Sequence, residues 1–148
     1  DKFIGDAVLA VFGVPVYRRN HLQRALAAAL DLQVELKKAS GGGNTLLNAV
    51  GISIDSGEVV AGNIGTQEKM EYTVIGDSVN TASRLNGLAG PGEVIISQTV
   101  FQKMGPLVDA EPFGPCRIKG VADAVVCYRL KGLTKAPVSH ATRIKRPA

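Results

Sequence analysis

Asn80 and Arg84 are the side chains whose types and spacing most clearly suit a chemical task. They lie in YTVIGDSVNTASR, residues 72–84, which reads as a strand, a turn at Gly76 and a helix that opens directly after it. Residues four apart share one face of a helix. A carboxamide and a guanidinium pointing the same way suit a ribose oxygen and a phosphate. Alone, the pair is only suggestive, because Asn and Arg on a helix surface are usually just solvated.

Three further motifs accompany this pair in order along the chain. KFIGD, residues 2–6, is followed by a second apolar run and predicts a tight hairpin with Asp6 at its tip. Glycines recur in GISIDSGEVVAGNIG, residues 51–65, and RIKG, which contains Lys119, follows at 117–120. Each motif is weak by itself, whereas the ordered set is specific.

The ordered set resembles the catalytic domain of the class III nucleotidyl cyclases, the adenylate and guanylate cyclase family, from the first residue to about Leu130. The resemblance implies an α+β fold, the ferredoxin-like βαββαβ palm, here lacking its first strand and helices. It predicts a partial catalytic domain at 1–132 and a basic tail at 133–148. Because the chain begins inside an apparent strand and without Met, we expect a piece of a longer protein.

The family resemblance implies conversion of a nucleoside triphosphate to the 3′,5′-cyclic nucleotide and pyrophosphate. By resemblance, Asn80 orients the ribose, Arg84 contacts the α-phosphate in the transition state, and Lys119 holds the terminal phosphates. Asp6 is expected to bind metal, with two Mg²⁺ or Mn²⁺ ions per site. The family's other metal-binding Asp lies on a preceding strand that is absent from this chain. Simple turn chemistry is the alternative explanation of Asp6.

Lys2 and Thr73 are, by resemblance, the residues that read the purine. An ammonium only donates, so Lys2 satisfies the acceptor N1 of adenine and not the protonated N1 of guanine. Many adenylate cyclases have Asp where this chain has Thr73, whose hydroxyl is expected to accept from adenine N6, as in a Thr-type subgroup. Ordinary strand residues are the alternative for both positions. ATP is therefore the predicted substrate, with a guanylate cyclase as the alternative.

The resemblance implies a site shared by two copies of the chain. In the family, metal-binding and base-reading residues meet across a head-to-tail twofold interface, so Asp6 of one chain would face Arg84 of the other. The glycines of 51–65 suit an arm that approaches another backbone closely, although glycine-rich hairpins also occur without a partner. Without the first metal strand, this piece is expected to be weak or inactive.

Two other classes of protein remain open as alternatives. One is a catalytically silent, cyclase-like regulatory or dimerisation module. The other is a diguanylate cyclase or polymerase palm, against which the Phe-Ile-Gly-Asp hairpin argues, because those proteins have a Gly-Gly-Asp/Glu-Glu-Phe type of hairpin. Any sensor or regulatory domains are expected elsewhere in the parent protein.

Composition indicates one globular domain without a nucleic-acid surface. The chain has 148 residues, 45% hydrophobic and 20% charged, with no apolar run of membrane-spanning length. Its net charge of +4 arises in the last fourteen residues, and the remainder is balanced at 13 basic and 13 acidic side chains. A cytoplasmic location is expected, with membrane tethering of the parent left open. Cys116 and Cys127 are expected to be buried thiols, with a disulfide left open.

Periodicity predicts the elements that position these residues. Helices are expected at 21–39, with Asn20 as the N-cap, at 78–88 and at 98–104. Strands are expected at 46–56, 57–65, 71–75 and 93–97, and as short strands from there to Leu130. Helices are expected on one face of a mainly antiparallel sheet.

Overall fold

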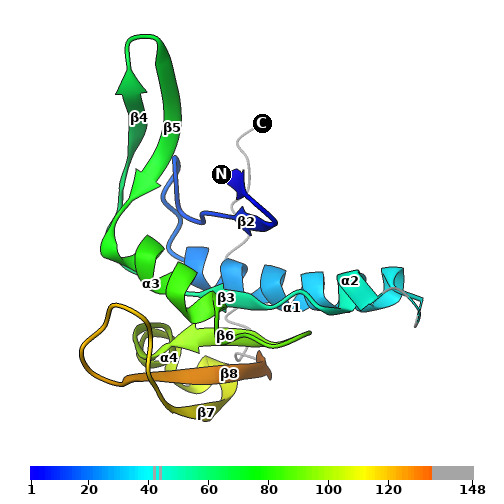
Figure 1. Ribbon diagram of the computed structural model, residues 1–148. Coiled ribbons are helices and arrows are strands. Elements are labelled where there is room, and N and C mark those ends of the chain that lie inside the picture. The colour runs from blue at the N-terminus through cyan, green and yellow to red at the C-terminus, as the bar shows by residue number, and fades with distance from the viewer. Residues whose placement is uncertain (42, 44, 135–148) are drawn as a thin grey trace, which may run out of the picture.

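The computed structural model describes residues 1–41, 43 and 45–134, so the predicted basic tail lies outside the described residues except for its first two positions. A central sheet has the strand order β3-β6-β8-β7, and two separate hairpins, β1–β2 and β4–β5, stand outside it (Figure 1). This arrangement confirms the predicted α+β class.

The central sheet is mainly antiparallel, as predicted. β6 (Val94–Ser97) runs parallel to β3 (Ile52–Ile54) and antiparallel to β8 (Val125–Leu133). β7 (Val108–Cys116) completes the sheet by antiparallel pairing with β8.

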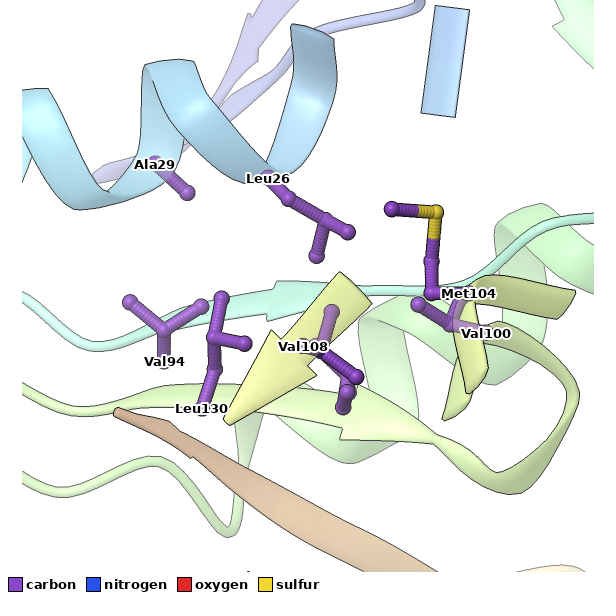
Figure 2. Close-up of a cluster of buried hydrophobic side chains, with 8 residues drawn as sticks. Leu26, Ala29, Val94, Val100, Met104, Val108 and Leu130 are labelled. Carbon is purple, nitrogen blue, oxygen red and sulfur yellow. The ribbon is translucent and has the colours of Figure 1, made fainter. Parts of the chain in front are cut away.

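Helix α1 (His21–Ala39) covers one face of this sheet, with the bounds predicted from its apolar spacing. Leu26 and Ala29, one turn apart, point from the helix toward Val94 and Leu130 (Figure 2). A fully buried leucine stabilises the fold by about 1.5–3 kcal/mol. The same core is closed by α4 (Gln98–Met104) and a short 3₁₀ turn, η1, at Gly105–Leu107, and α4 also matches its predicted range.

Helix α3 (Asp77–Asn86) covers the opposite face, so the expectation that helices lie on one face only is wrong. Leu85 packs against Ile95 and Cys127, whereas the neighbours of Ile95 along β6 pack toward α1. Successive side chains of a strand point to opposite faces. All four residues of β6 are buried, and such a strand needs a cover on both sides.

The predicted strand at 46–56 is wrong over its first half, where helix α2 (Thr45–Asn48) forms and only Ile52–Ile54 pairs. Gly51 lies directly against Ala89, whose carbonyl oxygen would be 2.6 Å from a Cβ at position 51. Asn20 occupies the predicted N-cap position of α1, but its side chain makes no capping hydrogen bond, because its φ of −95° and ψ of 18° lie outside the extended region that capping requires.

The two hairpins agree with the prediction. β1 (Lys2–Ile4) pairs with β2 (Ala7–Leu9) around Gly5, whose φ of 61° suits glycine. β4 (Val60–Thr66) pairs with β5 (Lys69–Ile75), and this arm projects away from the sheet beyond α3 (Figure 1). Within the described chain, no helix is long and apolar enough to span a bilayer.

Both cysteines are free thiols, and the disulfide left open by the sequence is not present. Cys127 is fully buried, and burial together with the neighbouring Cys116 raises the pKa of its thiol to about 12. Cys127 therefore behaves as a small apolar core residue.

Candidate active site

A hairpin cluster, made of Asp1, Lys2, Glu71 and Thr73, forms where the β1–β2 hairpin meets β5. Lys2 Nζ lies 3.1 Å from Glu71 Oε1 and 3.8 Å from Asp1 Oδ2. Thr73 Oγ1 donates to the same Asp1 oxygen at 3.4 Å, although the two residues are 72 positions apart. The structure thus brings Lys2 and Thr73, the two residues predicted to read the purine, to one carboxylate.

A second group, the helix cluster, contains Asn80 and Arg84 of α3 together with Lys119 and Gly120 of the β7–β8 loop. A Cβ at Gly120 would lie 3.6 Å from Arg84 Nη2, so the guanidinium rests against the backbone that follows Lys119. Leu85 and Ile118, one residue away from Arg84 and Lys119 respectively, pack in one buried core. The arrangement of the helix cluster is therefore fixed from below by apolar packing.

The side chains of the helix cluster are exposed and uncommitted. Asn80, Arg84 and Lys119 make no side-chain hydrogen bond or ion pair with any of the described residues. Two cations and a carboxamide without partners are suited to bind an anion such as a polyphosphate.

Asp6 lies at the exposed tip of the β1–β2 hairpin, and among the described residues no side-chain hydrogen bond or ion pair joins it to either cluster. Within the described part of the chain, no group of three or more His, Cys, Asp or Glu side chains gathers in a form that would hold a metal. Magnesium commonly takes only one or two carboxylates and completes its shell with water and substrate phosphates. A single exposed carboxylate at a turn fits that kind of site.

The candidate residues form an open surface in a single copy of the chain. Two hollows of the described chain lie elsewhere: one is lined by residues around Phe12 and Pro15, the other by residues of α1 and α2 around Val34 and Leu47. A nucleotide bound by this one protomer would remain largely in solvent.

Asp1 and Glu71 were missed by the sequence reasoning. Glu71 lies two positions before Thr73 on β5, and alternate residues of a strand share a face. This spacing in the sequence could have placed Glu71 beside Thr73. No comparable signal exists for Asp1, because its contact with Thr73 depends on how two separate hairpins lie in space.

Comparisons with known proteins agree with this geometry. The family model for the adenylate and guanylate cyclase catalytic domain matches residues 2–132. Adenylate cyclase 1 of Rhizobium meliloti is 31% identical over 144 residues, which cover 91% of this chain and 21% of the relative. An uncharacterized protein of Mycobacterium tuberculosis is 45% identical over 94 residues, covering 60% of this chain and 15% of that protein.

Solved structures of both kinds of cyclase share the fold. The guanylate cyclase domain of RhGC from Catenaria anguillulae, in complex with GTP, superimposes with a TM-score of 0.74 at 27% identity, covering 90% of this chain and 71% of that one. The adenylyl cyclase CyaB from P. aeruginosa gives a TM-score of 0.70 at 26% identity, covering 91% and 72%. Fold similarity therefore does not separate the two substrates.

The chain belongs to the adenylate and guanylate cyclase catalytic domain family. It spans between 15% and 21% of the length of the two curated relatives described above. The class of protein is therefore a nucleotidyl cyclase domain, and its relatives of known fold include both adenylyl and guanylyl cyclases.

Proposed function

We propose that this chain is the catalytic domain of an adenylate cyclase, which converts ATP to 3′,5′-cyclic AMP and pyrophosphate in the cytoplasm. The observation that carries the proposal is the meeting of Lys2 and Thr73 at one carboxylate. An ammonium donor beside a hydroxyl acceptor complements the N1 acceptor and N6 donor of adenine. Guanine presents the reverse pattern at both atoms.

The helix cluster supports the phosphate half of the reaction. Arg84 is proposed to stabilise the charge that develops on the α-phosphate, Asn80 to orient the ribose, and Lys119 to hold the terminal phosphates. All three are exposed, and no described side chain neutralises either cation. Their charge is therefore available to the substrate.

Asp6 is the side chain proposed to hold divalent metal. Two Mg²⁺ or Mn²⁺ ions, when bound, supply activation of the ribose hydroxyl and shielding of the triphosphate. Asp6 itself contributes one carboxylate from a hairpin tip where no described cation competes for it.

The complete site is proposed to form between two copies of the chain, head to tail. Support comes from apolar side chains left exposed on the two hairpins, an arrangement that marks protein interfaces. They include Phe3, Ile4, Val8, Val60, Met70 and Ile75. The openness of the site in one protomer agrees with this proposal, because a second copy would cover it.

Subunit complementation tests the function and the shared site together. In the full-length protein that carries this chain, Asp6→Ala and Arg84→Ala homodimers should each be nearly inactive. If dimers reassort at random, mixing them should restore about a quarter of the wild-type sites, because half of the dimers are mixed and each has one intact site of two. No recovery on mixing would contradict the shared site.

Base choice is tested separately by Lys2→Glu. A carboxylate accepts where Lys2 donates, so the variant should lose ATP turnover and gain GTP turnover relative to wild type. Unchanged preference between the two nucleotides would refute the assignment of Lys2. Glu35→Gln, which removes one member of an exposed ion pair with Lys38 on α1, serves as the charge-changing control.

A further inference from the structure

The function proposed above assigns no task to Asp1 itself, although Lys2 and Thr73 meet at the Asp1 carboxylate. Its carboxylate contacts both Thr73 and Lys2, and its side chain is only 10% exposed, against 58% for that of Glu71. The backbone nitrogen of Asp1 donates to the Leu9 carbonyl at 2.8 Å, which holds Asp1 on the β1–β2 hairpin. A covered, fixed carboxylate acts on its neighbours more strongly than a solvated one.

The contact between Asp1 and Thr73 decides which way the hydroxyl hydrogen points. A threonine hydroxyl has one hydrogen and two lone pairs, so alone it donates or accepts as its partner requires. An ionised carboxylate only accepts, and Lys2 only donates. Asp1 therefore takes the Thr73 hydrogen, and Thr73 presents lone pairs to any ligand.

We propose that Asp1 is a positioning residue for base specificity, one that makes Thr73 an acceptor and thereby favours adenine over guanine. This inference rests on the proposed function, in which Thr73 contacts position 6 of the purine. Adenine carries an amino donor there, whereas guanine carries a carbonyl acceptor. With guanine, the Thr73 oxygen and the guanine carbonyl oxygen would face each other as two acceptors, and neither would have a donor. Unpaired polar groups reject a wrong substrate more strongly than a small difference in size does.

The surface beside Thr73 is open on the side of Gly62. Gly62 pairs directly with Thr73 across the arm, and opposed residues of an antiparallel pair share one face. A Cβ at Gly62 would meet nothing within 4 Å, so no described side chain fills this face of the arm directly opposite Thr73.

The test compares ATP and GTP affinity in the full-length protein that carries this chain. Displacement of a fluorescent ATP analogue by each nucleotide gives a ratio of dissociation constants that does not depend on turnover. Asp1→Asn supplies an amide that can donate to Thr73, and Asp1→Ala removes the acceptor altogether. Both should reduce the preference for ATP over GTP, Asp1→Ala by about 3- to 10-fold, the value of one hydrogen bond.

A double-mutant cycle separates this role from a merely structural one. In a Thr73→Val background the hydroxyl is gone, so Asp1→Ala should no longer change the ATP-to-GTP ratio. Glu35→Gln, with its distant exposed ion pair, should leave the ratio at the wild-type value. A structural defect would instead weaken both nucleotides alike, with or without Thr73.

The possible outcomes distinguish the inference from the proposed function. If the ratio in Asp1→Ala equals that of wild type, or changes as much in the Thr73→Val background, the inference is overturned while the cyclase assignment stands. The opposite result is also possible: the wild-type protein prefers ATP, Asp1→Ala reduces that preference, and no cyclic nucleotide forms. That result would contradict the proposed function and support the inference about Asp1.

Discussion

The hairpin cluster and the helix cluster are held in place by different physics. Asp1, Lys2, Glu71 and Thr73 are positioned by hydrogen bonds and ion pairs among themselves, between two hairpins outside the central sheet. The helix cluster makes no such bonds among the described residues and is carried by buried neighbours on α3 and the β7–β8 loop.

The difference matches what each cluster has to recognise. A purine edge is a pattern of donors and acceptors, so the residues that read it must have fixed hydrogen positions, which polar neighbours provide. A polyphosphate is recognised by charge, and free cations on a rigid base suffice. Mutations should therefore separate the clusters: polar changes in the hairpin cluster should alter selectivity between bases. In the helix cluster, polar changes should alter phosphate chemistry, and changes in the apolar packing beneath it should alter stability.

The largest effect is expected for Leu85→Ala, which removes the fully buried side chain beneath the helix cluster. Leu→Ala changes in a core cost about 2–5 kcal/mol. Urea unfolding should show this loss of free energy, with a fall in affinity for pyrophosphate at native conditions. Leu32→Ala is the control, because Leu32 is a half-exposed leucine of helix α1; its free energy of unfolding should stay near that of wild type. A stable Leu85→Ala protein would mean that packing does not hold this cluster.

Arg84→Ala is expected to reduce kcat by about 10²–10³, the usual loss when one donor to transition-state charge is removed. Arg84 is exposed and unpaired among the described residues, so the free energy of unfolding of the Arg84→Ala protein should stay close to that of wild type. The contrast with Leu85→Ala, one residue away, is the informative result. Steady-state kinetics and urea unfolding on the same samples measure both quantities, and equal loss of stability in both variants would contradict the division.

Gly120→Ala should have an intermediate effect on the same cluster. Gly120 has a φ of 83°, and a left-handed conformation costs a residue with a Cβ about 1–2 kcal/mol. The added Cβ would also touch the Arg84 guanidinium. We expect lower stability and a higher KM for ATP, measured by thermal unfolding and initial rates. Gly132→Ala, where a Cβ meets nothing within 4 Å, is the matched control.

Much of the helix cluster was predictable because its signals are local. The bounds of α1 and α4 follow from apolar spacing, and α3 from the turn at Gly76 and the helical pattern after it. Four-residue spacing then places Asn80 and Arg84 on one face. The proximity of Gly120 to Arg84 required the packing of Ile118 on Leu85, which no local pattern contains.

The hairpin cluster was predictable only in part. The two hairpins follow from turn residues and strand alternation, but their mutual placement follows from long-range contacts such as Lys2 with Glu71. The errors also involve long-range contacts. The strand predicted at 46–56 begins only at Ile52, after Gly51 has packed on Ala89, and β6 is buried on both faces by two different helices.

The smallest effect, and the finest test of the comparison, is expected for Glu71→Gln. Its carboxylate pairs with Lys2 at 3.1 Å but is 58% exposed, and exposed ion pairs contribute about 0–1 kcal/mol. Glu71→Gln should therefore leave the unfolding midpoint nearly unchanged and weaken nucleotide binding by no more than about 5-fold. Because ions screen such a pair, the difference from wild type should shrink as salt is raised from about 0.05 to 1 M. A large, salt-independent loss of binding would mean that Glu71 contacts the nucleotide itself, and the hairpin cluster would then recognise its ligand through charge as the helix cluster does.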